Sequence, residues 1–123
     1  MKKGLLIVGH GSRSKEAQEV FNYIVNKVKE KSKEKFFQID GAHMELCKPS
    51  IETKVEKFVN EGIEKVYMVP YFLYKGIHIK EDIPELIEKL QKKYPSVEFK
   101  FGEPIGREDK LADILIKRVQ DIL

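Results

Sequence analysis

Three side chains that can bind a metal ion or carry a proton each follow a short apolar segment of the chain. His10 follows the run LLIV, Glu45 follows a second apolar segment, and His78 lies in the loop after a third. If these segments are parallel strands of one sheet, their carboxyl ends share one edge, which is where open α/β folds bind ligands. The topology would then bring together two imidazoles and a carboxylate that are distant in sequence. The chemistry expected at this edge is binding of a divalent metal, proton transfer, or both.

This set of side chains suits a metal that is bound only in passing. Neutral imidazole and carboxylate favour borderline divalent metals such as cobalt, nickel, iron and zinc. A closed structural site normally uses four ligands, and the sequence has neither a CxxC nor an HExxH spacing. Two histidines and one glutamate therefore predict an open site with few protein ligands, from which the ion can leave.

The same residues also have structural interpretations. A histidine in a glycine-rich turn can bond its own backbone, and Glu45 could be an ordinary surface residue. His43 precedes Glu45 by two positions, on the same strand face, and we interpret it as structural. Cys47 is interpreted as a small hydrophobic residue, because nothing near it in sequence favours a thiolate.

A second chemistry suggested by the Gly-His-Gly turn is phosphoryl transfer, because a glycine loop before a helix can bind an anion. Histidine phosphatases have a similar opening, with an Arg-His-Gly motif after a first strand. Here Gly9 stands where that arginine would be, so the phosphate clamp is missing. Walker-type and GxGxxG patterns are also missing from the sequence, and this alternative ranks second.

The elements that must position these residues alternate between strand and helix patterns. Short apolar runs predict strands at 5–8, 36–44, 66–69 and 97–101. Helical spacing of apolar residues predicts helices at 14–33 with Ser14 as the cap, from Pro49 to Gly62, at 81–93 and at 109–123. Residues 71–79, YFLYKGIHI, are expected to form a loop whose tyrosines could line a flat pocket. Four β-α units in series predict an α/β fold with a mainly parallel four-stranded sheet flanked by helices.

Length and composition limit the class of protein. A chain of 123 residues with 41% hydrophobic residues predicts one domain, residues 1–123, with a real core. The 23 basic and 20 acidic residues nearly cancel, and a net charge of +3 gives no reason to expect nucleic-acid binding. A single cysteine excludes an internal disulfide and fits a reducing compartment. With neither a signal peptide nor an apolar run of membrane length, we expect a cytoplasmic protein.

Four segments together resemble one known family. They are LLIVGHGSR at 5–13, MELCKPSI at 44–51, VPYFLYKGIHIKEDIPEL at 69–86 and EPIGRED at 103–109. In order and spacing they are similar to the small class II tetrapyrrole chelatases, the short-type sirohydrochlorin cobaltochelatases. Nickel-inserting archaeal enzymes and sirohydrochlorin ferrochelatases are similar too. The resemblance covers nearly the whole chain, and the GHGSR and GxHxxxDIP segments are specific only in combination.

The resemblance implies an ATP-independent lyase that inserts a divalent metal into sirohydrochlorin with release of two protons. It makes His10 a metal ligand and the base for a pyrrole proton, His78 the second metal ligand, and Glu45 an aid to metal delivery or proton removal. The metal would be a substrate, with Co²⁺ favoured and Ni²⁺ or Fe²⁺ as alternatives, and there would be no fixed cofactor.

The expected tetrapyrrole contacts surround these three residues. The loop residues Leu73, Tyr74, Lys75, Gly76 and Ile77 would lie along the macrocycle. Ser12 and Arg13 belong to the first motif, and Lys48 would lie near the rim. Arg13, Lys48, Lys75 and Lys80 could meet the carboxylates of the macrocycle, although an exposed lysine is more often simply solvated.

This chain departs from the family pattern at two positions, and the resemblance also implies an oligomeric state. Relatives commonly have an acidic residue at position 48 and an apolar one at position 43, where this chain has Lys48 and His43. Larger members resemble two such units fused, so this chain is one half-unit and is expected to form a homodimer. A non-catalytic tetrapyrrole or metal carrier is the alternative from another functional class.

Overall fold

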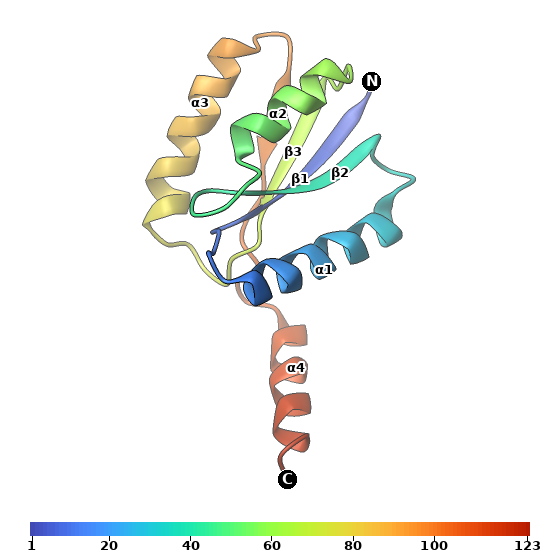
Figure 1. Ribbon diagram of the computed structural model, residues 1–123, viewed down its shortest axis with the longest axis vertical. Helices are drawn as coiled ribbons and strands as arrows, with labels where there is room; N and C mark the ends of the chain where they lie inside the picture. Colours follow the sequence, from blue (N-terminus) through green and yellow to red (C-terminus); the bar gives the residue numbers. More distant parts are fainter.

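The computed structural model describes residues 1–123 apart from the side chain of His78. Strands and helices alternate along the chain, as predicted (Figure 1). The strands are β1 (Lys3–Gly9), β2 (Gln38–His43), β3 (Lys65–Pro70) and β4 (Glu98–Phe101). The helices are α1 (Lys15–Ser32), α2 (Ile51–Asn60), α3 (Ile83–Lys93) and α4 (Asp109–Gln120), with a π-helical turn, η1 (His78–Asp82), directly before α3.

The four strands form one parallel sheet in the order β2-β1-β3-β4. The two central strands are therefore β1 and β3, and the loops after them are neighbours at the carboxyl edge. This confirms the predicted α/β fold with a parallel four-stranded sheet, and it adds the strand order.

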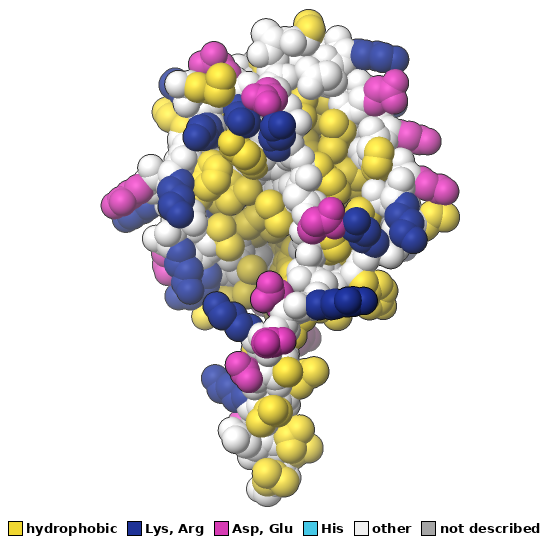
Figure 2. Space-filling model, turned by 180° about the vertical axis from the view of Figure 1, so that it is seen from behind, with side chains coloured by type: hydrophobic (Ala, Val, Ile, Leu, Met, Phe, Trp, Pro, Cys, Tyr) yellow, Lys and Arg dark blue, Asp and Glu magenta, His cyan; other side chains and the backbone are white. Residues whose placement is uncertain are grey.

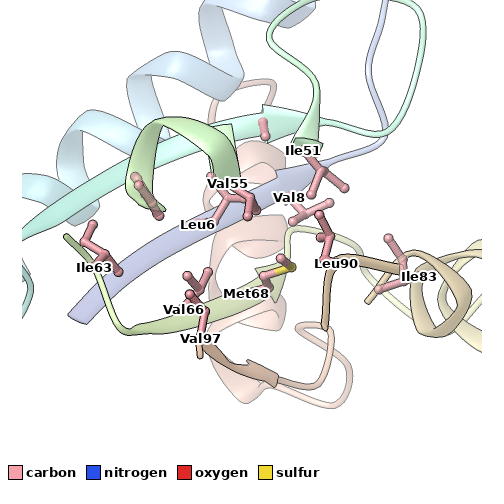
Figure 3. Close-up of a cluster of buried hydrophobic side chains, with 12 residues drawn as sticks. Leu6, Val8, Ile51, Val55, Ile63, Val66, Met68, Ile83, Leu90 and Val97 are labelled. Atoms are coloured by element: carbon pink, nitrogen blue, oxygen red, sulfur yellow. The ribbon is translucent and has the colours of Figure 1, made fainter. Parts of the chain in front are cut away.

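The main core lies between the sheet and the helices α2 and α3. Alternate residues of β1, Leu6 and Val8, point to this side and pack with Phe58 of α2 and Leu90 of α3 (Figure 3). On the other side of β1, Ile7 packs with Phe21 and Val25 of α1. Because both faces of β1 are covered, its run is apolar throughout, as expected for a central parallel strand.

Helix α4 differs from the other three because it projects away from the body of the molecule (Figure 1). None of its residues is buried. No helix among the described residues is long and apolar enough to cross a membrane.

Some predicted boundaries differ from those observed. The second strand begins at Gln38 and not at 36, because its ladder with β1 starts at the Gly4–Gln38 pair. The next helix begins after Ser50, whose side chain accepts a hydrogen bond from the Thr53 N–H, so Pro49 lies outside it. Pro70 ends β3 and does not interrupt it, and α4 stops at Gln120. The predicted cap Ser14 is confirmed, since its side chain accepts from the Ala17 N–H.

Candidate functional site

Backbone hydrogen bonds join the three loops at the carboxyl edge of the sheet. The N–H groups of Met44 and Glu45 donate to the carbonyl oxygens of Gly9 and His10, at 3.0 and 3.2 Å. The Tyr71 N–H donates to the carbonyl of Val8 at 2.8 Å. The turn that carries His10 is therefore held between the ends of β2 and β3 by backbone hydrogen bonds.

The glycine that follows His10 is required by this close approach. Gly11 has a φ of +100°, which L side chains rarely adopt, and a Cβ there would overlap the carbonyl oxygen of Glu45. The second glycine of the Gly-His-Gly pattern thus has a steric cause, because only glycine at position 11 lets the first turn lie against the end of β2.

His10 is exposed, and its orientation is supported by an aromatic ring. The imidazole stacks on Phe72 with ring centroids 4.6 Å apart and an interplanar angle of 24°. Phe72 is buried, and it is the second residue after β3, in the loop that was predicted to be aromatic. This contact fixes the plane of the imidazole while leaving the histidine at the surface.

Two hollows meet at His10. The smaller, of about 150 Å³, is formed by the first turn, by Gln18 and Phe21 of α1, and by His43 and Tyr71. The larger, of about 280 Å³, is lined by His10 together with Tyr71, Phe72, Leu73, Tyr74 and Gly76. His10 and Tyr71 line both, so the imidazole lies beside an aromatic surface that a flat ligand could contact.

Glu45 lines neither of the two hollows that meet at His10. Its backbone contacts the first turn, and the residue lines a separate hollow of about 180 Å³, between the start of α2 and the start of α3. Glu52 and Asp82 line the same hollow. The structure therefore brings the Glu45 backbone to His10 and places Glu45 at a hollow that it shares with two other acidic residues.

The second predicted ligand, His78, has a side chain outside the described part of the structure. Its backbone begins η1, at the far end of the 71–77 loop from Phe72. Within the described residues, no group of three or more His, Cys, Asp or Glu side chains is arranged to hold a metal ion.

The predicted tetrapyrrole-contacting residues fall into three groups. Ser12 lines the smaller hollow, and Leu73, Tyr74 and Gly76 line the larger one. Lys75 forms an ion pair with Glu103 at 2.8 Å and lines a further hollow with Lys80. Arg13, Lys48 and Ile77 are exposed, and among the described residues they line neither of the hollows that meet at His10.

His43 ends β2 and lies beneath the smaller hollow. Its side chain is buried, its ring lies 4.7 Å from that of Phe21, and its Nδ1 atom has no hydrogen-bond partner. Burial lowers the pKa of His43 below its ordinary value. The structural interpretation of His43 agrees with this burial, although its contact with the hollow was not foreseen.

Sequence reasoning missed the parts played by Phe72, Phe21 and Gln18 in this site. Gln18 donates from its side chain to the carbonyl of Ser12 at 2.8 Å and so ties α1 to the first turn. The aromatic spacing in YFLY marked the loop as a pocket wall, but it does not distinguish which ring packs under His10. Helical periodicity marks Phe21 as a core residue and carries no sign of the adjoining hollow.

Comparison with known proteins places this arrangement in a family. The sequence model of the CbiX family matches residues 4–122. The sirohydrochlorin ferrochelatase of Bacillus subtilis strain 168 is 36% identical over 99% of this chain, which corresponds to 46% of the relative. The sirohydrochlorin cobaltochelatase of Methanopyrus kandleri is 30% identical over 97% of this chain and 96% of the relative.

Solved structures agree with the sequence comparison. The sirohydrochlorin chelatase SirB from Bacillus subtilis subspecies spizizenii, in complex with cobalt, superimposes with a TM-score of 0.91 at 35% identity. The match covers 99% of this chain and 51% of SirB. The cobalamin biosynthesis CbiX protein of Marinobacter aquaeolei VT8 gives a TM-score of 0.76 at 30% identity, over 97% and 95% of the two chains. This chain thus spans about half the length of the Bacillus relatives and nearly all of the shorter ones, and it belongs to the CbiX family.

Proposed function

We propose that this protein is a sirohydrochlorin chelatase that inserts a divalent metal ion, with Co²⁺ favoured and Ni²⁺ or Fe²⁺ as alternatives. The observation that carries the proposal is the placement of His10. It is an exposed imidazole fixed by stacking on Phe72, at the junction of two hollows beside an aromatic surface. The names of the relatives supply the substrate class.

His10 would act on both substrates. The overall reaction replaces two pyrrole N–H protons by one M²⁺ ion, so two protons leave as the four ring nitrogens bind the metal. A neutral imidazole can either hold a borderline divalent ion or accept one of these protons. Few protein ligands, with His78 as the second, would leave most coordination positions free, so the macrocycle nitrogens can take the ion.

The loop after β3 would hold the macrocycle. Leu73, Tyr74 and Gly76 form the far wall of the larger hollow, where a flat apolar ring system could stack, with Ile77 just beyond. Arg13, Lys48, Lys75 and Lys80 would meet the peripheral carboxylates, which for Lys75 requires exchanging its ion pair with Glu103 for one to the substrate.

The acidic hollow beside the site would serve metal delivery. Glu45 lines it with Glu52 and Asp82, and its backbone is bonded to the turn that carries His10. Carboxylates there would attract hydrated divalent cations to the edge of the site. This assigns Glu45 to delivery and leaves proton removal to His10.

The proposal extends to the cofactor requirement, the location and the oligomeric state of the protein. The metal would be consumed as a substrate, with no fixed cofactor and no ATP requirement, and the single Cys47 fits a cytoplasmic location. Because the chain matches about half of the Bacillus relatives, it would be one half-unit and act as a homodimer.

The decisive experiment measures insertion directly. Purified protein is mixed anaerobically with sirohydrochlorin and, in separate samples, Co²⁺, Ni²⁺ or Fe²⁺, and the absorbance change of the macrocycle is followed. Controls lack enzyme, because metals insert slowly unaided. His10→Ala and His78→Ala are compared with Asn26→Ala, a substitution on the exposed surface of α1.

We expect the protein to accelerate metal insertion. Each histidine substitution should reduce the insertion rate by at least about a hundredfold, as is typical when a positioned general base is removed. Asn26→Ala should retain the full rate. If the protein binds sirohydrochlorin but accelerates the insertion of none of the three metals, it is a carrier and not an enzyme. Acceleration that survives in His10→Ala would remove His10 from the mechanism.

A further inference from the structure

The smaller of the two hollows that meet at His10 contains a buried polar side chain whose hydrogen-bonding capacity is not used. His43 is 6% exposed, and its Nδ1 atom has no hydrogen-bond partner. A buried polar atom without a partner costs free energy, and in a folded protein it commonly marks a place where a ligand, an ion or water binds. The structural interpretation of His43 explains its burial but not this unpaired nitrogen.

The strand register directs the His43 side chain toward the hollow. Ile7 packs against α1 and pairs with Gly41 of β2, so Gly41 and His43, two positions later, face α1 as well. A Cβ at Gly41 would lie 2.6 Å from the ring of Phe21, so glycine lets the strand lie close to α1 there. His43 follows at the end of the strand, where it contacts Phe21 and lines the hollow. The buried imidazole is therefore part of the wall.

The other groups around the smaller hollow favour an anion. Helix α1 begins beside it with Ser14 as the cap, and Ala17 and Gln18 line the wall. The N-terminus of a helix carries a partial positive charge, which favours an anion and disfavours a metal ion. The Ser12 hydroxyl accepts from the Ser14 N–H at 3.0 Å, so its own hydrogen is available to a ligand. Among the described residues that line the hollow, none is Asp or Glu.

The size and the charge of the hollow select a carboxylate. A volume of about 150 Å³ can hold several water molecules, or one carboxylate with one or two methylene groups. No lysine or arginine is among the described residues that line it, so a singly charged carboxylate is favoured over a doubly charged phosphate. A carboxylate there could accept from Ser12, from His43 and from Gln18, whose side-chain nitrogen has a second N–H besides the one bonded to the Ser12 carbonyl.

The lysines and arginines of the surface do not fix a carboxylate in one place. On the face seen from behind, they are spread around the hydrophobic surface of the body and are not gathered at one point (Figure 2). Such flexible cations attract carboxylates over a distance, but each exposed ion pair adds little to affinity. A hollow with positioned donors can instead hold a carboxylate in one orientation.

We propose that the smaller hollow binds a carboxylate, and that this carboxylate is one short side arm of the tetrapyrrole. His10 and Tyr71 line both hollows, so a macrocycle against the aromatic wall of the larger one can extend an arm past His10 into the smaller one. This rests on the proposed function and names the part of the substrate that the hollow holds. Because the resemblance implies an apolar residue at position 43 in relatives, the arm site would be a feature of this chain.

A bound arm would set the position of the macrocycle relative to His10. A flat ring system that only stacks on an aromatic wall can slide and rotate along it. Holding one arm in the smaller hollow removes this freedom and keeps the same pyrrole N–H beside the imidazole of His10. His43 would thus bind the substrate without contacting the reacting nitrogens.

Binding of sirohydrochlorin without metal tests the arm site separately from metal insertion. The dissociation constant is measured anaerobically, from the absorbance of the macrocycle, for the unmodified protein and for His43→Leu, His43→Gln and Val25→Ala. Val25 packs with Phe21 on the same face but lines neither hollow, so its substitution controls for lost packing. Circular dichroism and urea unfolding verify that each variant is folded.

We expect His43→Leu to raise the dissociation constant at least about tenfold, which is typical for the loss of a hydrogen bond to a charged group. His43→Gln keeps a side-chain N–H and should raise the constant less than about threefold, and Val25→Ala should leave it unchanged. An equal constant for His43→Leu and the unmodified protein would overturn the arm site and leave the chelatase proposal intact. Absence of binding by the unmodified protein would overturn both.

Nuclear magnetic resonance of the unmodified protein distinguishes the arm from a free carboxylate. The chain has three histidines, and comparison with His43→Gln assigns the ring signals of His43. We expect sodium acetate to shift these signals relative to sodium chloride at equal ionic strength, and bound sirohydrochlorin to abolish this effect. Signals of His43 that respond to neither ligand would overturn the site. An acetate effect that persists with sirohydrochlorin bound would overturn the assignment to the arm, because the hollow would then hold a free carboxylate.

Discussion

The two faces of the sheet are built differently. On the α2 and α3 face, Val55 and Phe58 are fully buried and pack with alternate residues of β1 and β3 (Figure 3). On the α1 face the buried cluster is small, and the ring of Phe21 is also a wall of the hollow beside His10. The first face is closed, whereas the second contains a buried histidine, a hollow and the exposed apolar side chain of Val69.

This difference shows how one small fold separates stability from function. The closed face supplies the buried apolar area that keeps the sheet folded. The open face can then leave a polar atom such as His43 Nδ1 without a partner and expose Val69 and Tyr71 at the same time. Substitutions on the two faces should therefore have different consequences.

The sharpest test of this separation compares two phenylalanines. Phe58→Ala empties a fully buried site and should lower the free energy of unfolding by about 3–5 kcal/mol. Phe21→Ala should cost about 3 kcal/mol, because its cavity joins an existing hollow. Phe21→Ala should also slow metal insertion by about ten- to a hundredfold by displacing the first turn, whereas the folded Phe58 variant should keep its rate.

Urea unfolding followed by circular dichroism gives the stabilities, and anaerobic insertion at saturating substrate gives the rates. If Phe58→Ala does not fold, Phe58→Leu takes its place. Equal loss of insertion rate in the two folded variants would mean that the closed face also shapes the site, and the contrast between faces would be wrong.

The second prediction isolates the contact between the first turn and the end of β2. Gly11→Ala and Gly62→Ala both place a side chain at a positive φ, which costs about 1–2 kcal/mol in each case. At Gly62 the nearest atom to the new Cβ would be 3.7 Å away, so little more is expected. At Gly11 the Cβ would overlap the Glu45 carbonyl, so a further loss of about 1 kcal/mol and a large loss of insertion are expected.

Thermal and urea unfolding of the two glycine variants check the first part, and insertion rates check the second. Similar stabilities together with full activity of Gly11→Ala would show that the turn can move away from Glu45 without harm. The close approach would then be incidental to the site.

Much of the fold could be predicted because local patterns determine it. The run at Leu5–Val8 is apolar on both faces, which is typical of a central parallel strand, and Ser14 has the chemistry of a helix cap. Strand ends in a parallel sheet share an edge, so the placement of the His10 and Glu45 loops at one edge follows from the alternation of strands and helices. Their direct contact depends on the strand order, which the sequence does not reveal.

The features that could not be predicted are the placement of individual side chains and the surfaces that they contact. No local pattern tells that Glu45 lines a hollow with Glu52 and not the hollows beside His10, because this depends on how the start of α2 lies against the start of α3. The stacking of His10 on Phe72 joins residues from the loops that follow two different strands. The amphipathic pattern of α4 predicts a helix with a covered side, but it does not distinguish a cover within the chain from one on another copy.

The smallest expected effect concerns pH and the buried imidazole on the open face. Burial lowers the pKa of His43 in the folded protein below 6.5, so the unfolded chain binds more protons as the pH falls past that value. The stabilising contribution is complete above about pH 6.5 and is lost progressively as the pH falls toward the folded-state pKa, by at most about 1.4 kcal/mol per pH unit. His43→Leu should therefore show a weaker fall in unfolding free energy between pH 7.5 and 5.5 than the unmodified protein, in urea titrations at each pH. Parallel curves of unfolding free energy against pH for the two proteins would mean that water reaches His43 in the folded protein and that the open face does not bury it.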